Sequence, residues 1–291
     1  MKLIADSGSS KTAWKLIGHS GKVKDIKTSG INPFFRSEDD IYQELEKYLL
    51  PETGTDIEQI YFYGAGIVNT EKGEIIQRAL TRIYTHATIE THSDVLGAAI
   101  ALFGNEAGIA CILGTGSNAC LYDGEKITQG ISPLGFILGD EGSGAVMGRK
   151  LLGDYFKEVM PAPLRDEFSI RFNITREEAL NRVYSAEKPN QFLAQFVPFL
   201  SEHENSAYCQ GLVQQSFIEF FERNVIKLPR YNTYPIGFIG SVAWHFSQIL
   251  NNTASYFGFE QTILVKDPID GLEKYYTNRY EQNDHRKHHR S

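Results

Sequence analysis

The sequence DSGSSKT at residues 6–12, directly after the apolar run LIA at residues 3–5, decides the fold. A second turn of the same kind, GTGSN at residues 114–118, follows the apolar run IACIL at residues 109–113. Each turn lies between strand-like stretches and offers small residues and hydroxyls, so that the backbone can approach a phosphate closely. Two such turns predict a duplicated domain with one nucleotide held between the copies.

The composition is that of an ordinary globular protein. The 291 residues are too many for one small core and suit two domains of roughly 100–200 residues each. The net charge is −7 and there is no long basic stripe, which argues against a nucleic-acid partner. No apolar run approaches the ~20 residues that span a membrane, and Asp6 follows Met1 too closely for a signal peptide. We therefore expect a cytoplasmic protein without a membrane partner.

The cysteines exclude two further classes of protein. The 3 cysteines form no CxxC pair, so neither a disulfide framework nor a structural zinc site is expected. Cys111 and Cys120 lie in strand-like runs, where a buried apolar thiol is the ordinary outcome.

Hydrophobic periodicity predicts a similar order of elements in the two halves of the chain. In the first half we expect strands at 2–5, 13–17, 23–28, 57–63 and 87–91, and helices at 37–50, 70–84 and 94–103. In the second half we expect strands at 108–113, 119–122, 126–129, 235–239 and 261–265, and helices at 142–226 with proline interruptions, at 244–256 and at 269–280. The pattern βββαβαβα in the first half predicts an α/β protein.

Two other phosphate-binding folds do not fit the turns. A Rossmann fingerprint needs a helix after its glycines, because the helix N-terminus binds the pyrophosphate. Residues 119–124, ACLYDG, instead indicate a strand and a hairpin turn. A Walker A loop requires the spacing GxxxxGK[ST], which no segment of the chain has.

Short segments along the chain together resemble one family. They are DSGSSKT at 6–12, GINP at 30–33, SD at 93–94, GTGS at 114–117, LGDEGSG at 138–144 and IGSV at 239–242. In this order they resemble the first phosphate motif, the sugar-side turn, the catalytic Asp segment, the second phosphate motif, the GDEGS motif and the adenosine motif of the N-acetylglucosamine kinases and related BadF/BadG-type ATPases. This family lies within the actin-like ATPase superfamily of sugar kinases, heat-shock ATPases and actin.

The resemblance implies a fold and its division into domains. We expect duplicated RNase H-like (actin-like ATPase) domains of the α/β class, with βββαβαβα repeated and a helical insertion in the second half. The N-terminal lobe is expected at residues 1–107 and the C-terminal lobe at residues 108–291, with the insertion at about 145–228. Packing of the last helix back onto the first lobe stays open.

The resemblance also implies ATP and Mg²⁺ as cofactors and gives roles to two aspartates. Asp94 is the implied catalytic base, which accepts the proton of a sugar hydroxyl that attacks the γ-phosphate. Its alternatives are a helix-capping role for Asp94 and a base at the neighbouring His92. Asp6 is the implied metal residue, which holds Mg²⁺ through water, and its alternative is a loop cap.

Further residues carry implied binding roles. Nucleotide binding is implied for Gly8, Ser9, Ser10, Lys11, Thr12, Gly114, Thr115, Gly116, Ser117, Gly240 and Ser241. Substrate binding is implied for Asn32, Asp94, Pro133, Leu134 and Asp140. Alternative interpretations stay open for three residues. Lys11 is equally interpreted as a solvated turn residue, and Asn32 as a turn former before a proline. Glu141, next to Asp140, is interpreted as a salt-bridging residue.

The expected activity is that of an ATP-dependent kinase that phosphorylates N-acetylglucosamine or a related amino sugar. One alternative is an ATPase that acts as a conformational switch on a protein partner. Another is a sugar or nucleotide sensor without turnover, which the serines in the first phosphate turn keep open. The chain lacks the cysteines that hold an iron–sulfur cluster in the dehydratase activators, which argues against a redox activator. The expected partner is a small sugar, and a homodimer stays open.

Overall fold

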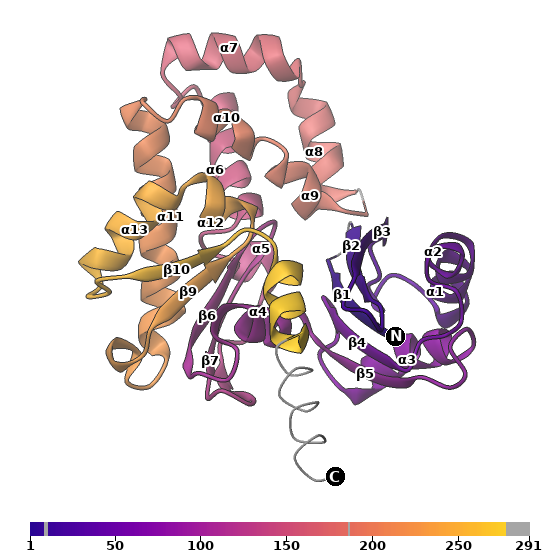
Figure 1. The fold of residues 1–291 in the computed structure, drawn as a ribbon. Coiled ribbons are helices and arrows are strands. Elements are labelled where there is room, and N and C mark those ends of the chain that lie inside the picture. Colours follow the sequence, from indigo (N-terminus) through magenta and orange to yellow (C-terminus); the bar gives the residue numbers. More distant parts are fainter. Residues whose placement is uncertain (9–10, 186, 278–291) are drawn as a thin grey trace. The chain divides into compact units, whose positions relative to one another are not determined.

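The computed structural model describes residues 1–8, 11–185 and 187–277, and the chain divides into two compact units (Figure 1). The first unit comprises Met1–Asn105 together with the described residues 267–277. The second unit comprises Glu106–Lys266. Each unit is built around its own mixed sheet of five strands.

The sheet of the first unit has the order β3-β2-β1-β4-β5. Its strands are β1 (Lys2–Ser7), β2 (Lys11–Ile17), β3 (Val23–Ser29), β4 (Gln59–Gly64) and β5 (Thr88–Ser93). β1 pairs antiparallel with β2 and parallel with β4, so it is a central strand. Its residues Leu3, Ile4 and Ala5 are fully buried, as expected for a strand covered on both faces.

The helices of the first unit follow signals in the sequence. They are α1 (Glu38–Glu44), the π-helical turn η1 (Leu45–Leu49), α2 (Leu50–Thr53), α3 (Thr70–Thr81), α4 (Asp94–Phe103) and a helix described over residues 268–277. The side chain of Ser37 accepts a hydrogen bond from the backbone of Asp40, and Asp40 completes a capping box. The single helix predicted at 37–50 is divided, because its hydrogen bonds change to the π pattern at Leu45.

The helix at 268–277 packs within the first unit through close contacts. Its Gly271 lies so near α4 that a Cβ there would be 2.5 Å from the carbonyl oxygen of Ala101. The hydroxyl of Tyr276 lies 2.5 Å from that of Tyr63 on β4. Lys15 on β2 forms ion pairs with Asp270 at 3.1 Å and with Glu273 at 2.9 Å. Glycine is needed at position 271 because the two helix backbones approach closely there.

The sheet of the second unit repeats this topology, with the order β10-β9-β6-β7-β8. Its strands are β6 (Gly108–Leu113), β7 (Ser117–Tyr122), β8 (Ile127–Gly130), β9 (Ile236–Ile239) and β10 (Thr262–Val265). β6 pairs antiparallel with β7 and parallel with β9, as β1 does with β2 and β4. Each sheet therefore places its first strand centrally, and the predicted duplication of an RNase H-like α/β fold is confirmed.

The helical region of the second unit is more divided than the sequence predicts. Its helices are α5 (Gly135–Leu138), α6 (Gly144–Phe156), α7 (Ala162–Phe172), α8 (Arg176–Tyr184), α9 (Pro189–Ala194), α10 (Val197–Glu202), α11 (Ala207–Arg223), α12 (Ser241–His245) and α13 (Ser247–Tyr256), with short 3-10 turns η2 (Val225–Lys227) and η3 (Tyr231–Thr233). A Cβ at Gly148 of α6 would lie 1.9 Å from the carbonyl oxygen of Leu193 on α9, so α6 needs this glycine. Aromatic contacts such as that of Phe168 with Phe199, at 5.2 Å, fill the insertion.

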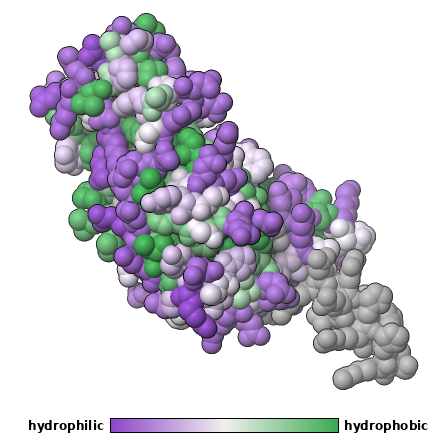
Figure 2. Space-filling view, turned by 90° about the vertical axis from the view of Figure 1, so that its left-hand side faces the viewer, coloured by the Kyte–Doolittle hydropathy of each residue, from purple (hydrophilic) through white to green (hydrophobic). Residues whose placement is uncertain are grey.

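The surface is mostly polar where Figure 2 shows it, with hydrophobic residues in small separate groups. Scattered apolar side chains of this kind are ordinary on a protein surface. Within the described ranges, no helix has both the length and the apolar character that crossing a membrane requires. The three cysteines are buried thiols that form no disulfide.

Candidate functional site

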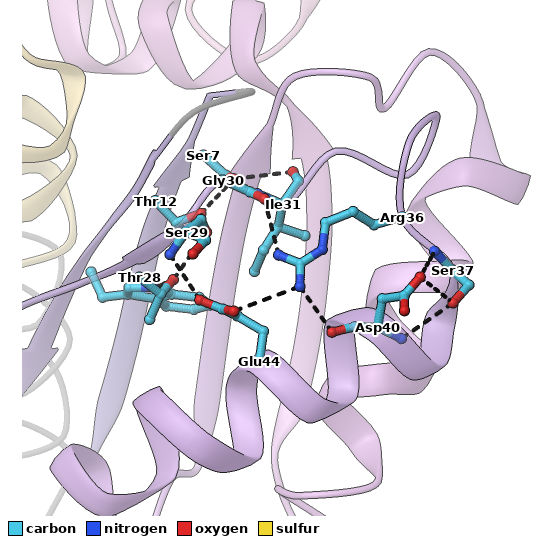
Figure 3. Close-up of polar contacts among 11 residues, drawn as sticks. Ser7, Thr12, Thr28, Ser29, Gly30, Ile31, Arg36, Ser37, Asp40 and Glu44 are labelled. Carbon is cyan, nitrogen blue, oxygen red and sulfur yellow. Dashed lines mark hydrogen bonds and ion pairs between the residues drawn. The ribbon is translucent and has the colours of Figure 1, made fainter. Parts of the chain in front are cut away.

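The first phosphate turn is held by a hydrogen-bond network at its two ends (Figure 3). The hydroxyl of Ser7, at the end of β1, lies 2.7 Å from that of Thr12 on β2. Ser7 also accepts a hydrogen bond from the backbone nitrogen of Ile31 at 3.0 Å, and Thr12 donates to the carbonyl of Ser29 at 3.0 Å. Both hydroxyls are buried and serve this network. The turn is thereby joined to the segment that resembles the sugar-side turn.

The same network continues to α1 through one arginine (Figure 3). Arg36 donates to the carbonyl of Gly30 at 3.2 Å and to that of Asp40 at 2.9 Å. It also lies 3.7 Å from the carboxylate of Glu44, which accepts a hydrogen bond from the backbone of Ser29 at 2.9 Å. These charge-assisted bonds fix the segment between β3 and α1, in which Asn32 lies.

Asn32 is buried at the centre of a tight turn. Its Oδ1 accepts a hydrogen bond from the backbone nitrogen of Phe34 at 2.9 Å, as in an Asx turn. Gly66 packs against it with a φ of 85°, and a Cβ there would lie 2.3 Å from Oδ1 of Asn32. Lys72 donates to the carbonyl of Pro33 and lies 4.7 Å from the centre of the Phe34 ring. The turn-forming role expected for Asn32 is therefore present, and its substrate role stays a prediction.

Carboxylates gather at the ends of β1 and β5. Burial raises the pKa of Asp6 to about 7, with further increases from Asp94 and Asp267 and an opposing effect of Lys11. Asp267 lies 3.6 Å from the ammonium group of Lys11, which is exposed. Sequence reasoning missed Asp267, because no motif surrounds it. In the described part of the chain, no group of three His, Cys, Asp or Glu residues is arranged to hold a metal ion directly.

Asp94 is the first residue of α4 and does not cap it. The cap is Ser93, whose side chain accepts from the backbone nitrogen of Leu96 at 3.3 Å. The carboxylate of Asp94 accepts from the backbone nitrogen of Val95 at 2.9 Å, and burial raises its pKa. His92 lies within β5, where its ring stacks on that of Tyr63 at 5.4 Å. Asp94 is therefore a carboxyl group with a raised pKa at the junction of β5 and α4, and His92 is a stacked ring within β5.

The second phosphate turn is held by the start of α6. The backbone nitrogen of Gly114 donates to the carbonyl of Gly116 at 3.0 Å, which closes the turn. The first two residues of α6, Gly144 and Ala145, donate to the carbonyls of Gly114 and Thr115 at 2.8 and 3.1 Å. Two of the free N–H groups at this helix end are thus satisfied by the turn. Thr115 itself is exposed.

Asp140 joins the GDEGS segment to the second phosphate turn. Its Oδ1 accepts a hydrogen bond from the backbone nitrogen of Ser117 at 3.4 Å. Burial raises the pKa of Asp140, the Ser117 N–H lowers it, and Glu141 raises it. Its backbone is left-handed, with a φ of 54°, which aspartate tolerates better than most residues. The side-chain amide of Asn224 donates to the carboxylate of Glu141 at 3.2 Å, and the guanidinium group of Arg223 lies 3.7 Å from it. The salt-bridging role that stayed open for Glu141 is therefore present.

The adenosine-type segment depends on Gly240. Its φ is 118°, and a Cβ there would lie 2.4 Å from the carbonyl oxygen of Leu113, just before the second phosphate turn. Ser241 follows as the first residue of α12. The close approach of two backbones explains the glycine without any ligand.

A pocket of about 240 Å³ opens beside Asp140 in the second unit. It is lined by Ser117, Asn118, Ile131, Ser132, Pro133, Leu134, Leu138, Gly139, Asp140, Glu141, Arg223, Asn224 and Lys227. Three residues implied for substrate binding, Pro133, Leu134 and Asp140, thus share one cavity with Ser117 of the phosphate turn. Sequence reasoning did not find the contribution of Arg223 and Asn224, at the end of α11, to this pocket. Ser9 and Ser10, implied for the nucleotide, lie outside the described residues.

Comparisons with known proteins found similar solved structures. A solved structure of a candidate N-acetylglucosamine kinase from Porphyromonas gingivalis is 42% identical, with 96% of this chain and 100% of that chain covered and a TM-score of 0.90. A candidate N-acetylglucosamine kinase from Chromobacterium violaceum is 16% identical over 94% of this chain and 98% of its own, with a TM-score of 0.73. A ROK family glucokinase from Streptomyces griseus, solved with glucose and AMPPNP, is 15% identical over 94% and 97%, with a TM-score of 0.51. The comparisons with family models and with curated proteins gave no match.

The two more distant structures share the fold. The identity to the Porphyromonas gingivalis protein extends over nearly the whole chain. The chain therefore belongs to the family of N-acetylglucosamine kinases and related BadF/BadG-type ATPases, within the actin-like ATPase superfamily.

Proposed function

We propose that the protein is an ATP-dependent kinase that phosphorylates N-acetylglucosamine or a related amino sugar. One observation carries the proposal: in each unit, a phosphate-type turn is hydrogen-bonded to a segment that contains a residue assigned to the sugar. In the first unit Ser7 bonds to Ile31, next to Asn32. In the second unit Ser117 bonds to Asp140. Phosphate and acceptor contacts are thereby built from adjacent groups, as transfer between two bound molecules requires.

Asp94 acts as the general base in this proposal. A base must hold the proton of the attacking hydroxyl, and a carboxylate with a raised pKa holds it more strongly than an ordinary one. Burial provides this increase at Asp94, whose carboxylate accepts a hydrogen bond from the backbone of Val95, and the cap of the helix is Ser93. In phosphoryl transfer most of the acceleration comes from positioning and charge, so the base supplies one part of it.

In this proposal each phosphate turn is suited to nucleotide oxygens, and Asp6 takes the metal role. The residues assigned to the first turn are Gly8, Ser9, Ser10, Lys11 and Thr12, and those assigned to the second are residues 114–117. Gly240 and Ser241 are assigned to the adenosine side. Asp6 fits a hydrated Mg²⁺, because the carboxyl groups of Asp94 and Asp267 are near enough to raise its pKa, and magnesium binds through few carboxylates and several waters. When bound, this ion neutralises phosphate charge.

Each unit contains a polar side chain suited to sugar hydroxyls. Asn32 and Asp140 offer an amide and a carboxylate, groups that hydrogen-bond to sugar hydroxyls. Pro133 and Leu134 give the pocket beside Asp140 an apolar wall, and Leu134 is 59% exposed. An N-acetyl group is one substituent that such a wall accommodates.

The experiment is an assay of ADP release by the full chain with ATP and Mg²⁺, with and without a panel of amino sugars. We expect release only when an accepted sugar is present. ADP release that is independent of sugar would contradict the proposal and favour the ATPase switch. Binding of sugar and ATP without any turnover would contradict it in favour of a sensor.

A further inference from the structure

The pocket beside Asp140 has a cationic side that a neutral sugar does not need. Arg223 ends α11, and Lys227 ends the 3-10 turn η2, and both line the pocket. Asn224 lies between them on the same wall. This wall comes from the helical region and lies outside every segment that resembles a family motif.

The charges of this wall are only partly matched by protein groups. Arg223 lies 3.7 Å from the carboxylate of Glu141, whose side chain is only 14% exposed, and Asn224 donates to the same carboxylate at 3.2 Å. Lys227 is exposed and has no ion-pair partner within the described ranges. The positive charge of Lys227 therefore faces the pocket without a counter-charge from the protein.

The pocket lining carries both signs of charge. Arg223 is paired with Glu141, whereas Lys227 has no ion-pair partner among the described residues. The pocket thus offers the carboxylate of Asp140, which suits hydroxyl groups, and the ammonium group of Lys227, which suits an anion. A lysine ammonium is a compact charge that binds anionic oxygens without demanding a particular geometry.

We propose that this pocket binds an amino sugar that carries an anionic oxygen substituent, with Lys227 and Arg223 contacting the anion and Asp140 the hydroxyls. The inference rests on the proposed kinase function and names a substrate class for it. The nucleotide could bring anionic oxygens as well. Of the described residues assigned to the nucleotide, however, only Ser117 lines the pocket, whereas Pro133, Leu134 and Asp140 all do.

The test compares two ligands that differ in charge, by calorimetry on the full chain without nucleotide. The probes are N-acetylglucosamine and N-acetylmuramic acid, which is the same sugar with a carboxylate-bearing lactyl ether on one hydroxyl. The variant is Lys227→Gln, and the matched control is Lys157→Gln, an exposed lysine outside the pocket. We expect Lys227→Gln to weaken the acidic sugar roughly tenfold, which corresponds to about 1.4 kcal/mol, and the neutral sugar less than about twofold. The effect should shrink at high ionic strength.

Several results would overturn this inference. One is that the unmodified protein fails to bind the acidic sugar. Another is that Lys227→Gln weakens the binding of both sugars equally, or that the control variant Lys157→Gln has the same effect. A third is that, in a parallel titration, only the binding of ATP is weakened. If these occur while N-acetylglucosamine still drives ADP release, the kinase proposal stands and only the anionic class is wrong. Absence of ADP release with every sugar would instead contradict the proposed function.

Discussion

Asp140 and Ser117, which are 23 residues apart in the sequence, are joined by a hydrogen bond of 3.4 Å between a carboxylate oxygen and a backbone nitrogen. The bond ties the GDEGS segment to the second phosphate turn. It also lies at a residue with a left-handed backbone, where φ is 54°. The same side chain therefore serves the local fold and, in our proposal, the sugar.

Substitution of Asp140 should separate these two roles. Asp140→Asn keeps an acceptor for Ser117 and a residue that tolerates the left-handed region, so we expect a change in stability below about 1 kcal/mol. Asp140→Ala loses the acceptor and adds strain, so we expect it to cost about 1–3 kcal/mol. Chemical denaturation of both variants measures the difference. Equal losses would show that neither the hydrogen bond nor the backbone conformation matters.

The assignment of the base predicts a large effect on turnover. Asp94→Asn should lower kcat by roughly 10²–10⁴, the usual contribution of general-base catalysis, while the dissociation constant for ATP changes little. Steady-state kinetics with ATP titrations check both values. His92→Gln serves as the control, because His92 is the other candidate near this junction, and its kcat should stay close to that of the unmodified protein. A near-normal kcat for Asp94→Asn would transfer the role elsewhere.

Two glycines with opposite surroundings make a matched pair for stability. Gly240→Ala places a Cβ where the carbonyl oxygen of Leu113 is 2.4 Å away, at a φ of 118°, so the backbone must shift. We expect destabilisation of about 2 kcal/mol or more and weaker ATP binding. Gly211→Ala, within α11 and with open space around it, should instead stabilise by about 0.5–1 kcal/mol. Thermal unfolding gives the order of the two variants, and the reverse order would be incompatible with these packing contacts.

His203 predicts a pH dependence of stability in the helical region. Partial burial lowers its pKa, but hydrogen bonds to Glu167 at 2.7 Å and to the carbonyl of Phe199 at 2.8 Å raise it, with a net increase above 6.5. Because the folded state holds the proton more strongly, the protonation of His203 stabilises the fold. This stabilisation is fully present below the pKa of the unfolded state and is lost as the pH rises through the pKa of the folded state. The difference in unfolding free energy between the unmodified protein and His203→Gln should therefore shrink between pH 5.5 and pH 8.5. An NMR titration that places the His203 pKa below 6.5 would refute this.

The sheets could be predicted from the sequence because their strands are short apolar runs bounded by clear turns. The duplication was visible in the two phosphate-type turns, and the structure confirms it in the matching positions of β1 and β6. The helical stretch at 142–226 was less predictable. Its periodicity gives helices but not their breaks, which depend on tertiary contacts such as that of Gly148 with Leu193.

The candidate site was only partly accessible to sequence reasoning. Motifs located the turns, Asp94 and Asp140, since these lie in short continuous segments. Asp267 and Lys227 come from distant segments without a motif, and only the fold brings them to Lys11 and to the pocket. The buried hydroxyl of Ser7 could not be assigned to Ile31 either, because a side-chain contact between separate elements has no local signature.

The central claim is that the protein transfers the γ-phosphate of ATP to an amino sugar. The most direct measurement is mass spectrometry of the sugar after incubation of the full chain with ATP, Mg²⁺ and N-acetylglucosamine or related amino sugars, alongside the Asp94→Asn variant. We predict a sugar monophosphate formed in a one-to-one ratio with ADP, and its near absence with the variant. ADP formation without any phosphorylated sugar across the panel would contradict the account.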